Sequence, residues 1–188
     1  MPRIGVTGHV LLAKGTAELV RDCLDRQLER YADGPLHGVT CLADGADQLF
    51  ARAVLARGGT FEAIIPARDY RRNAVGPDNR PAFDELLGRA VRVSYMPFAT
   101  SGREAYLAAS EELLNRCDLL LAVWDGRPSA GIGDTADVVR VARERGLPVV
   151  VLWPAGARRR RPPASDPDPP APRPDGSGGP ARPVSTSR

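Results

Sequence analysis

The sequence is poor in residue types that mark particular classes of protein. It has only three cysteines, Cys23, Cys41 and Cys117, and no CxxC pair, which argues against a disulfide scaffold. All three lie within or beside apolar runs, so we expect small buried hydrophobes in a reducing compartment. The only histidines, His9 and His37, have no partner at metal-ligand spacing. We therefore predict no metal site and no resident cofactor.

Long apolar segments are also missing. No apolar run approaches the roughly 20 residues that span a bilayer. The start of the chain, Met1-Pro2-Arg3, leads into a short strand-like run and not into the apolar core of a signal peptide. We therefore expect no membrane partner and a cytoplasmic location.

Charge and proline are unevenly distributed along the chain. The net charge is +3, but residues 157–188 hold 7 arginines against 3 aspartates, which leaves residues 1–156 at about −1. The same segment contains 9 of the 18 prolines and no aromatic residue. Such a composition predicts a solvated, disordered tail at 157–188, including the arginine run 158–161, behind one domain at 1–156. A nearly neutral domain with few aromatics argues against nucleic-acid binding.

Short apolar runs alternate with stretches of helical periodicity. The runs are apolar on both faces, as the strands of a helix-covered parallel sheet must be. They lie at residues 4–7, 38–42, 61–66, 91–96, 119–124 and 149–153. This order predicts a doubly wound α/β fold, with a mainly parallel, Rossmann-like sheet of about six strands. One interval, 68–81, is polar and aperiodic, and we expect it at the carboxyl edge of the sheet, where such folds bind ligands.

Three turns carry residues suited to anion binding. In the first, Gly5-Val6-Thr7-Gly8-His9, glycines let the backbone approach an anion and Thr7 adds a hydroxyl, although a plain tight turn explains the pattern equally well. The motif is neither a GxGxxG fingerprint nor a Walker A loop. In the second, 42–47, Asp44 or Gly45 is expected to cap a helix whose first turn contains Asp47.

The third turn follows the run 119–124. Gly131, Gly133 and Thr135 come just before or at the start of a predicted helix, where free N–H groups and a hydroxyl suit a phosphate. Asp134 complicates this interpretation, because its own carboxylate can cap the helix and repel an anion. A glycine-rich loop with an acidic cap is therefore the structural alternative.

Together, the segments GVTGH, CLADGAD, IIPARDY, LLLAVWDG and GIGDTADVV resemble, in this order and spacing, the SLOG superfamily of Rossmann-like domains. Its members include LOG-type phosphoribohydrolases and the Rossmann domain of the DNA-processing protein DprA. The resemblance covers residues 3–154 and implies that a nucleotide or nucleotide-derived molecule binds at the carboxyl edge of the sheet. It implies a pocket lined by Gly5, Thr7, Gly8, Gly45, Asp47, Gly131, Gly133 and Thr135. We add His9, Arg103 as a bidentate phosphate ligand, and Trp124, which is placed to flank a base.

The sequence departs from the LOG-type hydrolases at their catalytic motif, PGGxGTxxE. With Thr135 aligned, the position of the glutamate holds Val138, and Asp137 lies one residue earlier, about 100° around a helix. In close TGHR relatives an arginine follows the histidine, whereas here Val10 does.

Three functions follow from this comparison. The leading hypothesis is binding of a nucleoside phosphate or an ADP-ribose-like molecule. The alternative is an enzyme that hydrolyses the N-glycosidic bond of a nucleoside 5'-monophosphate, with Asp137 or Asp47 as the catalytic carboxylate. DprA-like binding of single-stranded DNA is the third, disfavoured by charge. A homodimer through the apolar face of the helix at 107–114 is a further expectation.

Overall fold

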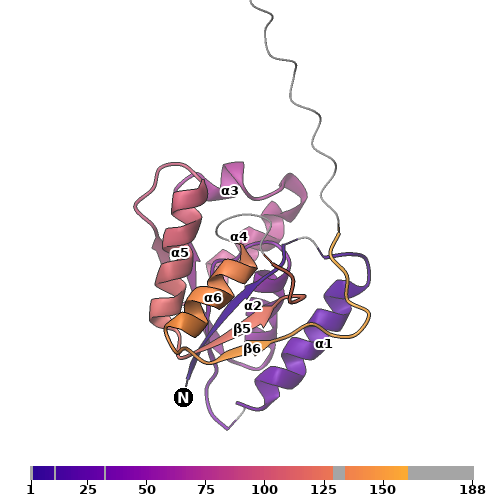
Figure 1. The fold of residues 1–188 in the computed structure, drawn as a ribbon. Helices are drawn as coiled ribbons and strands as arrows, with labels where there is room; N and C mark the ends of the chain where they lie inside the picture. Colours follow the sequence, from indigo (N-terminus) through magenta and orange to yellow (C-terminus); the bar gives the residue numbers. More distant parts are fainter. Residues whose placement is uncertain (1, 11, 32, 129–133, 161–188) are drawn as a thin grey trace, which may run out of the picture.

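Six parallel strands form one sheet, in the order β4-β3-β2-β1-β5-β6 (Figure 1). The computed structural model describes residues 2–10, 12–31, 33–128 and 134–160. The strands are β1 (Arg3–Gly8), β2 (His37–Thr40), β3 (Thr60–Ile65), β4 (Arg92–Tyr95), β5 (Leu119–Val123) and β6 (Val149–Val151). β1 contains a predicted apolar run, β4, β5 and β6 each lie within one, and β2 and β3 each overlap most of one. The predicted α/β class and the predicted number of strands are therefore confirmed.

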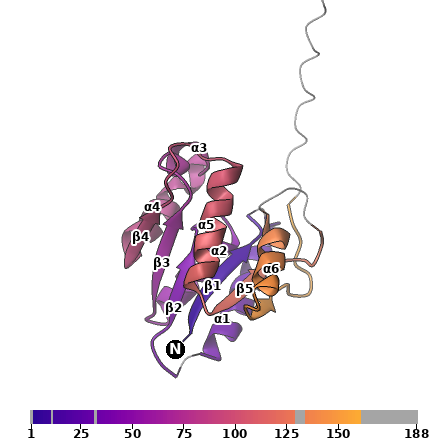
Figure 2. The ribbon, with the colours of Figure 1, turned by 60° about the vertical axis from the view of Figure 1, so that its left-hand side comes forward.

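Helices cover both faces of the sheet (Figure 2). One face packs against α1 (Thr16–Glu29), α2 (Ala46–Ala56) and α4 (Arg80–Arg89), and the other packs against α5 (Arg103–Arg116) and α6 (Thr135–Glu144). The chain runs outward from β1 to the edge strand β4, and α5 then carries it back across the sheet to β5, beside β1. The order of strands therefore reverses between β1 and β5.

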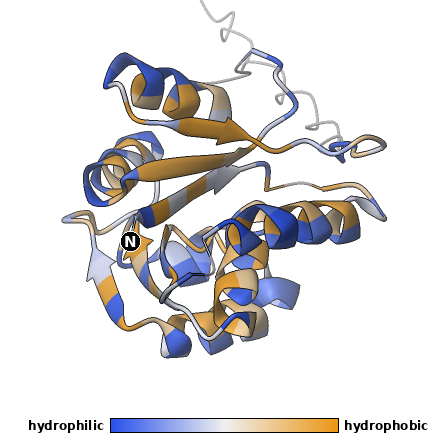
Figure 3. Cartoon of the chain, turned by 90° about the horizontal axis from the view of Figure 1, so that it is seen from below, coloured by the Kyte–Doolittle hydropathy of each residue, from blue (hydrophilic) through white to orange (hydrophobic). Residues whose placement is uncertain are grey.

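Burial follows the apolar runs closely. Every residue of β5 is buried, because this strand lies inside the sheet with helices on both faces. Ile4 and Val6 of β1 pack on the α1 and α2 side, whereas Leu120 packs on the α5 and α6 side. Figure 3 shows the same distribution, with mostly apolar strands and helices that carry polar outer faces.

The aperiodic interval 68–81 contains two short helical turns, α3 (Tyr70–Asn73) and the 3-10 helix η1 (Pro77–Asn79). Asp69 holds this interval in place, because its carboxylate accepts hydrogen bonds from the N–H and the hydroxyl of Ser101, each at 2.7 Å. A third bond, also 2.7 Å, comes from the side-chain amide of Asn73. The interval lies at the carboxyl edge, as predicted.

The chain does not leave the body of the protein at the predicted boundary, residue 156. After β6 it turns back, and Arg159 forms an isolated antiparallel bridge with Leu12. The N–H of Ala13 donates to the carbonyl oxygen of Arg158 at 2.9 Å. We call residues 155–160 the C-terminal segment. Residues 161–188, most of the predicted tail, lie outside the described residues.

Two further expectations concern surfaces. In the described part of the chain, no helix combines the length and apolar character that crossing a membrane requires. The apolar face of α5 is already used within the protein, because Leu113 and Leu114 are buried against the sheet. The homodimer stays a prediction.

Candidate functional site

The strand order reverses between β1 and β5, which marks the place at the carboxyl edge of the sheet where a ligand-binding crevice is expected. Open α/β folds bind their ligands in this position, because the loops that follow the two central strands diverge there. His9 is the first residue after β1, and Asp125 is the second residue after β5. Gly8 pairs with Val123 in register, so the two loops begin side by side.

His9 and Asp125 meet across this crevice. The Nε2 of His9 lies 3.3 Å from Oδ1 of Asp125 and 3.3 Å from its backbone nitrogen. The imidazole also makes an edge-on contact with Trp153, at 5.4 Å between ring centroids. Burial, and secondarily the charge of Arg159, lowers the pKa of His9 below its usual value. The imidazole is therefore neutral at neutral pH.

The third member of this group is Arg159, from the C-terminal segment. Its Nη2 donates to Oδ1 of Asp125 at 2.6 Å, and the Asp125 side chain is only 9% exposed. Burial raises the pKa of Asp125, but hydrogen bonds from Arg159 and from the N–H of Arg127 outweigh it, so the pKa is lowered. We call His9, Asp125 and Arg159 the switch-point cluster.

One donor in the switch-point cluster is unused. The Nε of Arg159 is buried and has no hydrogen-bond partner among the described residues. Buried N–H groups are nearly always paired in native proteins, because an unpaired donor loses its hydration without compensation. This donor therefore has capacity for one hydrogen-bond acceptor.

The C-terminal segment is fixed to α1 through Thr16. The Thr16 hydroxyl accepts a bond from the N–H of Arg158 at 3.0 Å and donates to its carbonyl oxygen at 3.1 Å. Thr16 is the first residue of α1 and is 2% exposed. These bonds, together with the bridge between Leu12 and Arg159, hold the Arg159 backbone beside the loop that follows β1.

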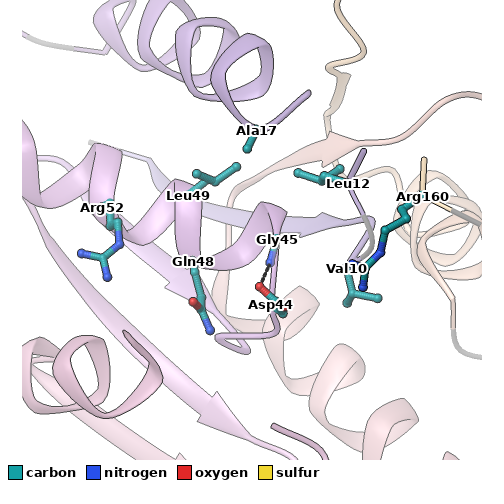
Figure 4. A pocket seen from close by; sticks show the side chains of 9 residues that line it. All are labelled: Val10, Leu12, Ala17, Asp44, Gly45, Gln48, Leu49, Arg52 and Arg160. Atoms are coloured by element: carbon teal, nitrogen blue, oxygen red, sulfur yellow. Dashed lines mark hydrogen bonds between the residues drawn. The ribbon is translucent and has the colours of Figure 1, made fainter. Parts of the chain in front are cut away.

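A cavity of about 300 Å³ lies between this loop and the start of α2 (Figure 4). Its lining includes Val10 and Arg160, the sequence neighbours of His9 and Arg159, but no residue of the switch-point cluster itself. This volume is at the lower end of the range for small-molecule sites. Figure 4 shows Arg160 reaching toward the cavity beside Val10, across from Gly45. The lining residues are Val10, Leu12, Ala17, Asp44, Gly45, Gln48, Leu49, Arg52 and Arg160.

The glycines of the first turn have packing roles. A Cβ on Gly8 would lie 2.5 Å from the Cβ of Ala46, so Gly8 lets α2 approach the end of β1. Gly5 lies three residues earlier, inside β1, and a Cβ there would meet the Sγ of Cys117 at 2.8 Å. Thr7 is half-buried between them. Gly8, Thr7 and His9 lie at the carboxyl edge, whereas Gly5 faces α5.

The second turn is held by Asp47. Its Oδ2 accepts bonds from the Thr40 hydroxyl at 3.1 Å and from the N–H groups of Cys41 and Ala43 at 3.1 and 3.4 Å. Burial raises the pKa of Asp47 to about 7, although these three bonds act in the opposite direction. The carboxylate thus binds its own turn, beneath the surface of the crevice.

Gly45, and not Asp44, is the N-cap of α2. It has a φ of 79°, in the left-handed region that glycine tolerates, and makes no side-chain cap. Asp44 instead accepts the N–H of Gly45 at 2.7 Å.

In the third turn, Asp134 caps α6, as the structural alternative described above has it. Its carboxylate accepts the N–H of Ala136 at 2.8 Å, and Thr135 behind it is buried. Asp137 lies in the first turn of α6, 3.7 Å from Arg140. Trp124 directly follows β5, and its indole N–H donates to the carbonyl oxygen of Arg127 at 2.9 Å. Gly131 and Gly133 lie outside the described residues.

Arg103 stands apart from the switch-point cluster. It is the exposed first residue of α5, the helix that links β4 to β5. Its predicted role in phosphate binding stays a prediction, as do the roles of the other residues implied by the resemblance.

Sequence reasoning missed two residues of the switch-point cluster. Asp125 has a local signal, because it is the second residue after a buried strand, much as His9 is the first residue after another. Arg159 has no local signal at all. It lies in the arginine run interpreted as solvated tail and reaches the crevice only because the chain turns back after β6.

Comparisons with known proteins show the fold. No protein-family model matches the sequence, and a search of curated proteins finds no relative. DNA processing protein A from Streptococcus pneumoniae superposes with a TM-score of 0.59 at 18% identity, over 80% of this chain and 50% of that one. The Helicobacter pylori protein of the same name, described with a single-stranded DNA binding mode, gives 0.58 at 16% identity, over 79% and 64%.

A different kind of protein is similar as well. A molybdenum cofactor binding protein from Rippkaea orientalis gives a TM-score of 0.53 at 17% identity, over 81% of this chain and 77% of that one. Against both DprA structures, this chain spans less than two thirds of their length. At such identities the likeness concerns the fold alone: this chain shares a Rossmann-like fold with these proteins.

Proposed function

We propose that this protein binds a nucleotide or a nucleotide-derived small molecule at the crevice between β1 and β5. The observation that carries the proposal is the switch-point cluster. It brings a neutral imidazole, a carboxylate and a guanidinium with an unused buried N–H to the place where open α/β folds take their ligands. Such groups suit the hydroxyls and the phosphate of a nucleotide.

The adjoining cavity supports a ligand of limited size. About 300 Å³ suits a single nucleotide better than a dinucleotide. The similar structures include one protein described as binding the molybdenum cofactor and another with a single-stranded DNA binding mode. The cavity is small, and the net charge of residues 1–156 is close to zero. Both features favour a small molecule over a nucleic acid as the ligand.

The test is a thermal-shift panel on the full chain with AMP, ADP, ADP-ribose, NAD, ribose 5-phosphate and a thymidine oligonucleotide. A ligand present at about 100 times its Kd adds roughly 2.7 kcal/mol to the free energy of unfolding. For a domain of this size we expect a rise in Tm of several degrees. The proposal fails if no nucleotide or ribose phosphate binds at millimolar concentration.

Hydrolysis of a nucleoside 5'-monophosphate stays the alternative. Asp137 is partly exposed at the start of α6, and Asp47 is buried under its own turn, so Asp137 is the more accessible carboxylate. Release of free adenine from AMP that disappears in Asp137→Asn would establish the enzyme. Equal release by wild type, Asp137→Asn and Asp47→Asn would remove both residues from that role.

A further inference from the structure

We infer that Arg159 binds the anionic group of the ligand, so that the site is incomplete without the C-terminal segment. The inference rests on the proposed function and names the part of the ligand that the segment recognises: a phosphate or a comparable oxyanion. The inference assigns a binding role to Arg159, although composition alone predicts that residues 157–188 form a disordered tail.

The first step concerns the donors of the guanidinium. Arginine carries five N–H bonds in a rigid planar fork. In Arg159 the Nη2 group is bound to Asp125, whereas Nε is buried and has no acceptor among the described residues. An oxyanion can occupy an unused edge of the fork while Asp125 keeps its own bond, and it would give the buried Nε a charged acceptor.

The second step concerns competing cations. Of the two arginines that line the cavity, Arg52 is engaged with Glu85, which its Nη2 contacts at 2.9 Å. Arg160 is the other, and it again comes from the C-terminal segment. The positive charge next to the crevice is therefore supplied largely by the segment, while the domain before it carries a slightly negative net charge.

Two roles of the C-terminal segment have to be distinguished. A wall forms a permanent side of the binding site, whereas a plug blocks the site until it detaches. A plug must detach before the ligand enters, which here means breaking the two bonds between Arg158 and Thr16 and the nearly buried contact between Arg159 and Asp125. A wall stays in place and contributes its unused donor. The anchored backbone and the unpaired Nε favour the wall.

The test compares Arg159→Gln with Arg158→Gln in the full chain. The two variants remove the same charge from adjacent positions, and the contacts of Arg158 with the body run through its backbone. Calorimetric titration with AMP, adenosine and pyrophosphate separates the phosphate from the nucleoside. We expect Arg159→Gln to weaken AMP and pyrophosphate binding at least tenfold and to leave adenosine unchanged, while Arg158→Gln stays within twofold of wild type.

The outcomes separate this inference from the proposed function. AMP binding that is unchanged in Arg159→Gln, or lost equally in both variants, overturns the inference and leaves the proposed function standing. Tighter binding in Arg159→Gln, or in a chain ending at residue 156, shows that the segment is a plug and also overturns it. In a further outcome, pyrophosphate binds in a way that depends on Arg159, but neither AMP nor any other nucleotide binds. This result supports the inference and refutes the proposal that the ligand is a nucleotide. The unliganded Tm of each variant verifies folding.

Discussion

The protein contains two similar clusters, each made of a histidine, a carboxylate and an arginine, one at each edge of the sheet. At the carboxyl edge is the switch-point cluster of His9, Asp125 and Arg159. At the amino edge, Nε2 of His37 lies 3.2 Å from Oε1 of Glu62, and Nη1 of Arg116 lies 2.9 Å from Oε2 of the same carboxylate. We call these three residues the amino-edge cluster.

The two clusters differ in how fully their groups are paired. In the amino-edge cluster, Arg116 also donates to Glu112 and to the Ser94 hydroxyl, and Nδ1 of His37 lies 3.0 Å from the Thr60 hydroxyl. Each partner comes from the sheet or from α5. The switch-point cluster draws Arg159 from the C-terminal segment, and within the described part of the chain the Nε of Arg159 has no acceptor. Similar sets of side chains thus serve packing at one edge and, in our proposal, ligand binding at the other.

The largest expected effect breaks the scaffold on which the switch-point cluster depends. In Gly8→Ala, the new Cβ would lie 2.5 Å from the Cβ of Ala46 and 2.8 Å from that of Val123. We expect such overpacking to lower the free energy of unfolding by about 3 kcal/mol, measured by urea denaturation. Gly76→Ala is the control, because nothing lies within 4 Å of a Cβ there. Equal stability of the two variants would contradict this account.

Arg116→Gln tests the amino-edge cluster. It removes a cation from a carboxylate that is only 17% exposed, and loss of one partner leaves the other charge inadequately compensated. We expect a loss of about 2 kcal/mol in the free energy of unfolding, moderated by Arg92, whose Nη1 lies 4.0 Å from Glu62. AMP affinity should not change. A variant that kept its stability but lost the ligand would reverse the roles of the clusters.

Asp47 adds a third carboxylate to the comparison. It is buried, and among the described residues it forms no ion pair with an arginine. Its pKa is about 7 in the folded protein against an ordinary 3.8. Between these values the folded state keeps a proton that the unfolded state has released, so stability falls as the pH rises, by at most about 1.4 kcal/mol per pH unit.

This contribution should disappear in Asp47→Asn. The wild type should therefore lose stability relative to the variant when urea unfolding is repeated from about pH 5 to about pH 7. A difference between the two that is independent of pH in this range would show that the folded carboxyl does not hold the proton.

The smallest effect concerns His9. Burial is the main cause of its lowered pKa, and the charge of Arg159 adds to it. Arg159→Gln should raise the pKa of His9 toward 6.5, measured by NMR of the imidazole ring. An unchanged titration of His9 would mean that Arg159 does not lie beside it in solution.

The sequence by itself determined the architecture of the domain. Strand runs that are apolar on both faces, such as 119–124, and the stripes of the intervening helices are local patterns, and burial on both faces leaves few other arrangements. The Asp134 cap was equally readable, because a cap acts on the N–H groups two or three residues ahead. The strands and their number were predicted correctly, and the cap was one of the two alternatives that the sequence offered for this turn.

Only the tertiary structure decided which polar groups meet. Asp47 follows a turn pattern that suits a ligand, yet its three bonds return to its own turn. Arg159 belongs to a run whose composition predicts solvation, yet it reaches a carboxylate 34 residues away in sequence. Hydrophobic periodicity is repeated over many residues and survives local exceptions, whereas a hydrogen bond depends on two atoms and on the path of the whole chain between them.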